Sequence, residues 1–418
     1  MPYTDAGAGE MNDDLFDLRM SEEARPLYEH VKKFIAEVVD PMSVKFHELD
    51  KNKTDIWSYA PGQLELLEEA KDEAKKQGLW NFFLPDAETG EGLKNLDYAY
   101  IAAELGKNAL ASETMNCSAP DTGNMEVLER VGTPQQKEQW LKPLLEGKIR
   151  SAFAMTEPAL PSSDAKNIST RAVLEGDEWV INGEKYYISG AGDPRCKIMI
   201  LMCLTSPEAE PYRQQSQILV PLDTPGVEIV GPMTVFGHDE APHGHMHIRL
   251  TDVRVPADNM LWGEGRGFEI SQVRLGPGRI HHCMRSIGQA EKALDLMIDR
   301  GVNRQAFGKR IIDLGKNMET VGRHRADIEP MRLMTLKAAR AMDVLGNKEA
   351  RYWISMIKAY VPEKTCKIID DTIQVHGATG VSQWTPLTDM YAHQRTLRLA
   401  DGPDEVHHAV VARKEVKD

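Results

Sequence analysis

The hydrophobic periodicity of the chain changes twice, from helical to β and back to helical, and this order limits the possible folds most. Residues 23–42 place apolar side chains three and four positions apart, as one helix face requires, and Pro41 is expected to end that helix. The apolar positions are Leu27, Val31, Phe34, Ile35 and Val38. Similar patterns at 63–80, 96–110 and 133–147 predict a helical segment over residues 1–150, with Gly78 ending the second helix.

The middle of the chain has the character of a small barrel or sandwich. Residues 171–192 contain two β-rich runs joined at Asn182-Gly183, which favours a type I′ hairpin at that point. Apolar runs at 197–205, 216–223 and 243–256 are further expected strands. Helical periodicity returns at 326–346 and 350–377. We therefore predict an α+β protein with a helical domain at 1–150, a β-barrel or sandwich domain at 151–265 and a four-helix bundle at 266–418.

Composition excludes several classes of partner. The net charge of −14 disfavours nucleic acid or an anionic membrane as the main partner. Five scattered cysteines without a CxxC pair argue against a disulfide framework or a zinc site and fit a reducing compartment. No apolar run reaches the roughly 18–20 residues that span a bilayer. Residues 1–18 have neither a secretion nor a transit pattern, so a cytoplasmic location is expected.

Four motifs could carry chemistry, and each has a plain structural alternative. The loop Met155–Asp164 has backbone N–H groups and hydroxyls suited to a flat heteroaromatic ring or a phosphate, but it is also an ordinary proline-rich connection. Residues 304–309 combine Arg, Phe and Lys, but they would also suit a helix C-cap. Two interpretations, a ligand site or a helix cap, also apply to the glycines of 374–382 and to Asp401 in the turn at 398–408.

The order and spacing of these motifs resemble the acyl-CoA dehydrogenase family. The resemblance is carried by MTEP…SSD, ING-K-x-YIS, R-xx-FG-K, Q-x-xG-xxG and DG-P-xE-xH, and it extends from Phe153 to the C-terminus. The combination GPGRIHH…ADGPDEVH looks most like the branch whose vertebrate members are fused to an aminoglycoside-phosphotransferase-like kinase. The resemblance implies an FAD-dependent enzyme that oxidises acyl-CoA thioesters to 2-enoyl-CoA and passes electrons to an electron-transferring flavoprotein. It also implies a homo-oligomer, a dimer at least and usually a tetramer.

The resemblance also assigns flavin contacts by position. It places the pyrimidine side of the ring at the loop with Phe153, Met155 and Thr156, covers the ring with the Tyr187 stretch, and holds the diphosphate and adenine with residues typically of a neighbouring subunit. Ser163 matches a serine that contacts CoA or the flavin phosphates, and Arg279 matches a recurring arginine near the base. The implied cofactor residues are Phe153, Met155, Thr156, Ser163, Tyr187, Ile188, Ser189, Arg304, Phe307, Gln374, Gly377, Ala378, Pro403 and Glu405.

The catalytic base is the sharpest implication of the resemblance. Most members use a Glu before a Gly in the turn that opens the last helix, and that position is Asp401, before Gly402. The other location used in the family is Gly278 here and cannot serve, so Asp401 is the matched candidate. A carboxylate in this role needs an environment that makes it a competent base. Ser163, Arg279 and Gly402 are expected to contact the substrate.

Two rival functions remain open at the level of sequence. One is a flavin oxidase of the same fold, resembling nitroalkane oxidase, which also uses an Asp base, or an acyl-CoA oxidase. The other is a catalytically inert FAD-bearing assembly subunit. The alternating His243, His245 and His247 are interpreted as one face of a strand, and no metal site is expected.

Overall fold

The computed structural model describes residues 13–84 and 90–416, apart from the side chains of residue 13 and of residues 273–277. The chain forms two compact units, each assembled from segments distant in sequence. One unit contains a β-sheet and comprises Met42–Leu84 and Glu113–Pro277. The other is helical, and its described residues are 13–41, 90–112 and 278–416. The division of the chain into domains at 150 and 265 stays a prediction.

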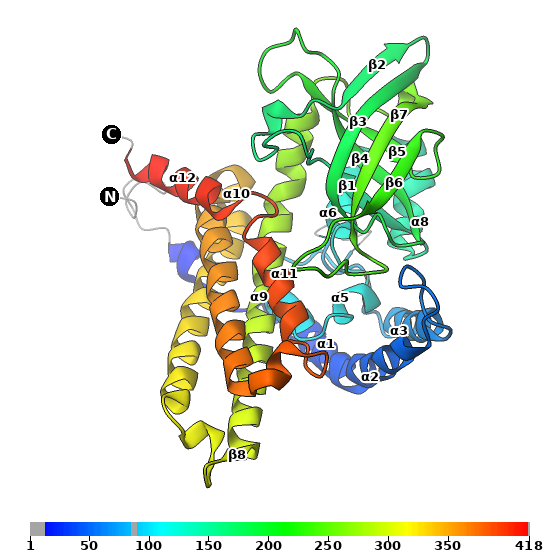
Figure 1. Cartoon of the computed structure of the whole chain (residues 1–418). Coiled ribbons are helices and arrows are strands. Elements are labelled where there is room, and N and C mark those ends of the chain that lie inside the picture. Colours follow the sequence, from blue (N-terminus) through cyan, green and yellow to red (C-terminus); the bar gives the residue numbers. More distant parts are fainter. Residues whose placement is uncertain (1–12, 85–89, 417–418) are drawn as a thin grey trace. The chain divides into compact units, whose positions relative to one another are not determined.

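The sheet unit is built around seven strands in the order β1-β4-β2-β3-β7-β6, with β5 paired to β4. Two of the pairings, β1 with β4 and β2 with β4, are parallel, and the others are antiparallel. Figure 1 shows the strands in green as a curled sheet. The strands are β1 Arg150–Ala154, β2 Arg171–Glu175, β3 Glu178–Ser189, β4 Cys196–Leu204, β5 Gln215–Pro221, β6 Val227–Pro232 and β7 His245–Pro256.

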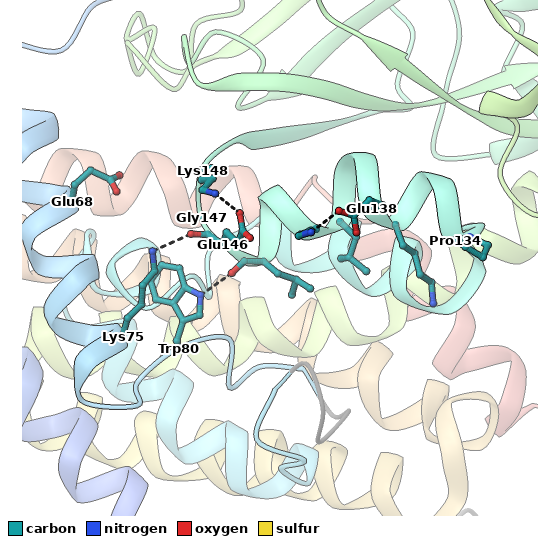
Figure 2. Close-up of a pocket in the computed structure, with 12 residues that line it drawn as sticks. Glu68, Lys75, Trp80, Pro134, Glu138, Glu146, Gly147 and Lys148 are labelled. Carbon is teal, nitrogen blue, oxygen red and sulfur yellow. Dashed lines mark hydrogen bonds and ion pairs between the residues drawn. The ribbon is translucent and has the colours of Figure 1, made fainter.

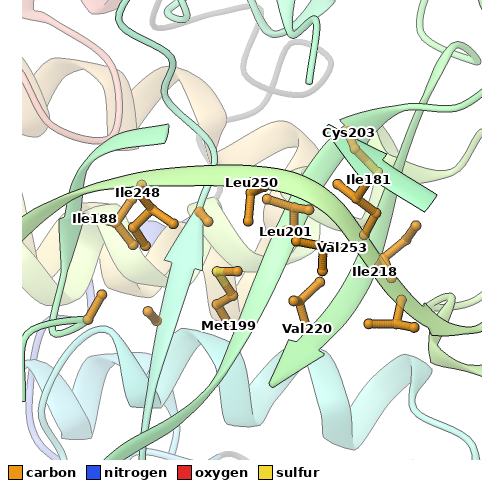
Figure 3. Close-up of a cluster of buried hydrophobic side chains, with 14 of the residues drawn as sticks. Ile181, Ile188, Met199, Leu201, Cys203, Ile218, Val220, Ile248, Leu250 and Val253 are labelled. Carbon is orange, nitrogen blue, oxygen red and sulfur yellow. The ribbon is translucent and has the colours of Figure 1, made fainter. Parts of the chain in front are cut away.

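The core of this unit lies on one face of the curled sheet. Alternate residues of β3, β4, β5 and β7 point to that face, as the two-residue period of a strand requires. Figure 3 shows their side chains packed together, among them Ile181, Ile188, Leu201, Val220, Ile248 and Leu250. The helices of the unit are α3 Gln63–Lys76, α6 Asp121–Val131, α7 Pro134–Gln136 and α8 Lys142–Leu145. Helix α3 is followed by Gly78 with φ 73°, so the expected stop is confirmed.

The hairpin expected at Asn182-Gly183 is wrong. Strand β3 runs through this pair and has a bulge there, opposite β7. The turn lies earlier, at Gly176-Asp177 between β2 and β3, where Gly176 has φ 66°. Asn182 instead exchanges two hydrogen bonds with Asp252, at 3.1 and 2.8 Å, across the bulge. An Asn-Gly pair favours any local backbone irregularity, and the long pairing with β7 decided which one formed.

The helical unit is a bundle built on two long helices. Helix α9 spans Gly267–Asn303 and joins the bundle from residue 278, and α10 spans Asn317–His376 with an interruption at Gly346 (φ 78°). They are linked by Thr372, whose hydroxyl donates to the carbonyl oxygen of Ala293 at 3.2 Å. The shorter helices α11 Leu387–Leu397 and α12 Asp404–Glu415 pack on α10.

Helices near the start of the chain complete the bundle. They are α1 Arg25–Phe34 and α4 Asn95–Leu105, while α2 Asp40–Glu48 and α5 Ala111–Thr114 have residues in both units. The helix expected to end at Pro41 does not end there, because a π-helical turn at Ile35–Val39 leads directly into α2. The irregular π-helical turn directly before Pro41 is one of the features that accompany a proline within a continuing helix.

Helices α4 and α9 are in close contact through glycines. A Cβ on Gly288 would lie 1.9 Å from the carbonyl oxygen of Ala103, and a Cβ on Gly106 would lie 2.0 Å from that of Arg285. Only glycine allows the two backbones to approach so closely. The segment of α9 that carries His281, His282 and Arg285 is therefore held firmly in the bundle.

Across the described part of the chain, no helix combines the length and the apolarity that a membrane crossing needs.

Candidate functional site

Residues that the motifs point to occur in both units. In the sheet unit, a buried ion pair anchors the loop that follows β1. Lys185 of β3 is fully buried, and its ammonium donates to Glu157 Oε1 at 2.8 Å and to the carbonyl oxygens of Met155 and Met202 at 2.8 and 2.7 Å. The Glu157 carboxylate also accepts from the backbone N–H groups of Ser169 and Thr170 at 3.0 and 2.9 Å.

The charges of this pair are strongly coupled. Burial raises the pKa of Glu157, but the charge of Lys185 and the hydrogen bonds outweigh burial and hold that pKa at about 2. Burial lowers the pKa of Lys185, and Glu157 opposes this. Because both partners are buried, neither charge is stable without the other. The pair thus fixes the path of Met155–Glu157.

Three predicted flavin contacts lie on or beside this anchored loop. Phe153 is on β1, and Met155 and Thr156 follow it, all three half-buried. Thr156 Oγ1 donates to the carbonyl oxygen of Tyr186 at 2.6 Å, and the Tyr186 N–H donates to the carbonyl oxygen of Thr156 at 3.1 Å. Ser163 lies farther along, exposed at the end of the loop.

The stretch 187–189 begins within a bulge of β3. Tyr187 has φ 53°, its ring is 42% exposed, and its hydroxyl donates to the carbonyl oxygen of Thr234 at 3.2 Å. Ser189 Oγ lies 2.8 Å from His245 Nδ1. Ile188 is 1% exposed and belongs to the core of the sheet. Its side chain therefore packs inward, and of this stretch Tyr187 presents an aromatic face to the surface.

In the helical unit, Arg304 and Phe307 lie at a short hairpin beyond α9. The strands are β8 Gln305–Ala306 and β9 Lys309–Arg310, and both turn residues have positive φ, Phe307 at 53° and Gly308 at 74°. The C-cap interpretation of this motif is wrong, because α9 has already ended and Gly308 serves the turn. The Phe307 side chain is 95% exposed. An aromatic ring displayed this way has no role in the packing of its own unit.

The second glycine motif ends α10. Gln374 is exposed in the last turn, and Gly377 is the C-cap with φ 64°, its N–H donating to the carbonyl oxygens of Gln374 and Ile373. Ala378 is exposed in the following turn, Gly377–Val381. The C-cap interpretation of Gly377 is thus confirmed. The exposed backbone of 377–378 remains accessible to a ligand.

Asp401 lies in a tight turn between α11 and α12 whose main chain is held by three side chains. Arg279 Nε donates to the carbonyl oxygen of Asp401 at 2.9 Å, and His407 Nε2 lies 3.2 Å from the same oxygen. The buried Lys358 donates to the carbonyl oxygens of Gly402, at 3.1 Å, and of Leu397. These bonds come from three different helices, α9, α10 and α12, and fix the turn from three sides.

The Asp401 carboxylate is contacted by helix α9. His282 Nε2 lies 3.3 Å from Asp401 Oδ2, and the two side chains are 17% and 19% exposed. A Cβ on Gly278, one turn earlier on α9, would lie 3.8 Å from the same oxygen. The two positions at which the resemblance allows a base therefore converge on one point of this unit. A carboxylate held there is largely shielded from solvent and has open space beside it at Gly278.

Helix α12 begins just after this turn. Pro403 is its N-cap residue, and no side chain caps the helix, so Asp401 is not an N-cap. Asp404 is buried and ion-paired with Arg398 at 2.7 Å. Glu405 is exposed in the first turn.

The sequence motifs did not identify four side chains that organise these places. Lys185 belongs to the ING-K-x-YIS motif, but the motif assigns no role to it. Nothing in the sequence distinguishes Lys358, since a lysine on a helix is usually solvated. His282 and His407 were visible as histidines, but only the tertiary structure brings them to Asp401. The spacing of Gly278 and His282, four residues apart on one helix, would have placed them on one face.

A surface pocket of the sheet unit, with a volume of about 770 Å³, lies away from all predicted site residues. It is lined by α3 and by the segment 134–148, as Figure 2 shows. Its polar groups are already bonded: Trp80 Nε1 donates to the carbonyl oxygen of Leu145 at 2.7 Å, and Lys75 to that of Glu146 at 3.0 Å. This pocket does not indicate a ligand.

The interpretation of the three alternating histidines as one strand face holds only for His245 and His247, because β7 begins at His245 and His243 lies in the turn before it. These two have carboxylate neighbours. His245 lies 2.9 Å from Glu240, and His247 lies 3.7 Å from Glu184. Among the described residues, no three His, Cys, Asp or Glu side chains are grouped to hold a metal ion.

Within each unit, the residues that the resemblance assigns to FAD have suitable chemistry. In the sheet unit, the Met155–Thr156 loop is anchored and offers backbone groups, and Tyr187 offers an aromatic surface, which suit a flat ring. In the helical unit, Arg304 offers a positive charge and Phe307 an exposed ring at the same hairpin, and residues 377–378 are exposed; these suit a diphosphate and an adenine.

Comparison with known proteins gives a consistent result. The chain matches the N-terminal, middle and C-terminal domains of acyl-CoA dehydrogenases over residues 21–148, 152–252 and 265–415. The probable acyl-CoA dehydrogenase FadE2 of Mycobacterium tuberculosis is 54% identical over 84% of this chain and 86% of its own length. A solved structure from Mycobacterium abscessus, assigned as an acyl-CoA dehydrogenase, is 46% identical, with a TM-score of 0.91 and coverage of 95% and 99%.

Longer relatives include the mouse acyl-CoA dehydrogenase family members 10 and 11. Both are 49% identical, over 96% and 95% of this chain, and the chain spans only 37% and 51% of their lengths. The butyryl-CoA dehydrogenase structure of Megasphaera elsdenii, 23% identical with a TM-score of 0.77 and coverage of 96% and 100%, shares the fold. The expected fold is confirmed, with an N-terminal helical, a middle sheet and a C-terminal helical part. The chain belongs to the acyl-CoA dehydrogenase family.

Proposed function

We propose that this chain is an FAD-dependent acyl-CoA dehydrogenase in which Asp401 removes the α-proton of the thioester. The observation that carries the proposal is the Asp401 turn. Its carbonyl oxygen is fixed by Arg279 and His407, and its carboxylate lies beside Gly278, the other position at which the family places its base. Membership of the family supports oxidation between the α and β carbons.

FAD, when bound, would accept the hydride that leaves the β carbon. Phe153, Met155 and Thr156 would bind the pyrimidine side of the ring, and Tyr187, Ile188 and Ser189 would cover it. Because Ile188 is part of the core, its contribution would come from its backbone. The remaining proposed contacts are Ser163 with the phosphates or CoA, Arg304 and Phe307 with the diphosphate and adenine, Gln374, Gly377 and Ala378 with the adenosine end, and Pro403 and Glu405 near the ring.

The chain's own chemistry begins with the carboxylate. Asp401 would take the α-proton while its backbone N–H stabilises the developing enolate oxygen. Asp is one methylene shorter than Glu, so the substrate must lie closer to this turn, and the open position at Gly278 leaves room for it. Gly402 and Arg279 line the same turn, which supports their assignment to the substrate side.

The proposal includes partners. An electron-transferring flavoprotein would accept the electrons, and the working form would be a homodimer or a dimer of dimers in the cytoplasm. Phe307, Val381 and Trp384 are exposed at 95%, 66% and 79%, so their side chains are available for contact with a further subunit. All five cysteines are buried and unbridged, which supports a reducing compartment.

An anaerobic titration tests the reaction. The purified yellow protein would be mixed with butyryl-, octanoyl- and palmitoyl-CoA, and bleaching of the flavin band would be recorded for the wild type, for Asp401→Asn and for Asp389→Asn. Asp389 is an exposed carboxylate on α11 and serves as the matched control. We expect bleaching in the wild type and the control, and loss of bleaching in Asp401→Asn.

The other outcomes discriminate between the alternatives. Bleaching that persists in Asp401→Asn would remove that residue from its role. Rapid oxygen consumption without an added acceptor would favour an oxidase of the same fold, and nitroalkanes would then be tested. A protein that binds FAD but reacts with no thioester or nitroalkane would be a non-catalytic subunit.

A further inference from the structure

On one face of helix α9, neighbouring residues form a row of contacts that leads to the proposed base, Asp401. Gly278 and His282 are four residues apart and both lie next to Asp401 Oδ2. Arg285 follows three residues later, and its Nη2 lies 3.1 Å from His282 Nδ1. Residues three and four apart share a helix face, so this row is a consequence of the local sequence. Arg285 itself is held where α9 and α4 are in close contact.

The contacts of His282 determine which ring nitrogen carries its proton. A guanidinium has only hydrogens to donate, so Arg285 Nη2 donates and His282 Nδ1 must accept. A neutral imidazole that accepts at Nδ1 carries its hydrogen on Nε2. That nitrogen lies 3.3 Å from Asp401 Oδ2, so the ring carries its hydrogen on the nitrogen nearest the carboxylate. The neighbouring His281 points elsewhere, with its ring centroid 4.7 Å from that of Tyr98.

The surroundings keep this imidazole uncharged. Burial lowers the pKa of His282, and the positive charges of Arg285 and Lys358 act in the same direction, against the opposing effect of Asp401. Arg279 and His407 also face the turn, and Cys283 and Asp404 interact with Asp401 or with the neighbouring Lys358. A neutral donor orients a carboxylate without neutralising it, whereas an imidazolium would stabilise the anion and weaken it as a base.

We propose that His282 is a positioning residue for the α-proton abstraction, donating from Nε2 to Asp401 Oδ2 and thereby fixing the plane in which the carboxylate receives the proton. The proposal rests on the proposed role of Asp401. The His282 ring thus orients the shorter Asp base from α9. Arg285 fixes the His282 tautomer in which Nε2 carries the hydrogen.

The test uses the FAD-loaded enzyme and five proteins: wild type, His282→Leu, His282→Gln, His281→Leu and Asp401→Asn. Each is mixed anaerobically with butyryl-, octanoyl- and palmitoyl-CoA, and the rate of bleaching is measured against pH. We expect His282→Leu to slow bleaching by about 10–100-fold, the cost of a misplaced reacting group. The acid limb of its profile should move to higher pH, since losing a donor favours the protonated carboxyl. A glutamine amide reaches the position of Nε2, so His282→Gln should restore most of the rate and the acid limb.

His281→Leu is the matched control for structural damage. It makes the same chemical change at the adjacent buried position of the same helix, so it should lower Tm without moving the acid limb. A His282→Leu enzyme whose rate and acid limb equal those of the wild type, while Asp401→Asn is inactive, would overturn the positioning role and leave the proposed base in place. Equal slowing in both leucine variants, without a shifted acid limb, would also overturn it.

A second readout does not depend on activity. The Tm of the Asp401→Asn/His282→Leu double variant is compared with the two single variants in a double-mutant cycle. We expect the two shifts in Tm to be non-additive, because the side chains are in contact. Additive shifts would show that the bond is absent and would overturn the inference even if no tested thioester bleached the flavin. Bleaching that survives in Asp401→Asn, by contrast, would refute the proposed base itself.

Discussion

Two consecutive residues with positive φ, Asp401 at 55° and Gly402 at 101°, turn the chain between α11 and α12. Aspartate tolerates the left-handed region better than most residues, and glycine adopts it without a steric penalty. The turn is further restricted because a Cβ on Gly402 would lie 2.9 Å from His407 Nε2, the nitrogen that contacts the Asp401 carbonyl. Backbone conformation and packing therefore both require glycine at 402.

We expect Gly402→Ala to lower the free energy of unfolding by about 1–3 kcal/mol, the usual cost of a strained φ. It should also slow flavin bleaching, because His407 must move away from the turn. Urea unfolding and stopped-flow bleaching measure the two effects. Gly176→Ala is the control, since Gly176 has φ 66° but open space around it. If the two variants were equally destabilised and Gly402→Ala bleached normally, the close contact with His407 would be unimportant.

Replacing Phe307 should affect FAD binding but not the stability of the FAD-free protein. The side chain is 95% exposed, so Phe307→Ala should leave the Tm of the FAD-free protein unchanged. If the ring packs on adenine as proposed, the variant should lose FAD more readily, and the ratio of flavin to protein after gel filtration measures this. Met318→Ala, another exposed apolar side chain of this unit, is the control. Normal flavin content in Phe307→Ala would remove Phe307 from the cofactor site.

Strand β3 positions two of the proposed flavin contacts, the Met155–Glu157 loop and the Tyr187 ring. Its buried Lys185 bonds to the Met155 carbonyl oxygen and to Glu157, and its bulge at Tyr186–Tyr187 turns the Tyr187 ring outward. The strand thus fixes one loop by charge and one side chain by backbone geometry. A regular strand would place residues 186 and 187 on alternate faces without this adjustment.

We expect Glu157→Gln to lower the free energy of unfolding by about 3–5 kcal/mol, because it leaves the buried Lys185 ammonium without its counter-charge. Urea unfolding of the FAD-free protein gives the change. The control is Glu184→Gln on the same strand, an exposed carboxylate paired with Arg249, where we expect less than about 1 kcal/mol. The Glu157 variant should also bind FAD more weakly if Met155 and Thr156 contact it. A loss comparable to that of Glu184→Gln would mean that Lys185 is not charged in the folded protein.

For the whole molecule, buried histidines link stability to pH. Burial lowers the pKa of His281 and His282, and burial together with Arg279 and Lys358 lowers that of His407 to about 3; burial also lowers the pKa of His243 to about 4. These rings stay neutral in the folded state, while the unfolded chain binds protons below a pKa of about 6.5. The unfolded state therefore gains protons first, and stability falls as pH decreases from about 6.5 toward 4.

Urea unfolding at pH 8, 6.5, 5.5 and 4.5 measures this dependence. We expect stability to be highest above pH 6.5 and to fall with a slope of up to about 1.4 kcal/mol per pH unit for each histidine that stays neutral. His407→Gln should reduce the slope below pH 6.5, whereas His408→Gln, the exposed neighbour on α12, should leave it unchanged. A stability that is constant between pH 6.5 and 4.5 would show that the buried rings take up protons without unfolding.

Much of the fold and the location of the candidate base could be read from local patterns. Helical periodicity, the apolar runs of the strands and the stop at Gly78 each depend on a few neighbouring residues, and the family motifs depend on spacing along the chain. Local rules were wrong at Asn182-Gly183 and at Pro41, where pairing with β7 and a π-helical turn at Ile35–Val39 overrode the local preference. At Asn182-Gly183 the competing interaction comes from β7, which the local signal does not include, whereas at Pro41 the π-helical turn lies within the predicted helix itself.

The sequence by itself determined the order of elements, the family and the residue that occupies the position of the base. Only the tertiary structure decided what surrounds that residue: His282 from α9 and Lys358 from α10 reach Asp401 and Gly402 across tens of residues of chain, and His407 of α12, six residues after Asp401, joins them. The reason is physical. Periodicity and capping depend on neighbours within a turn or two, whereas the charge, protonation and orientation of a buried group depend on whatever packing brings within a few ångströms of it.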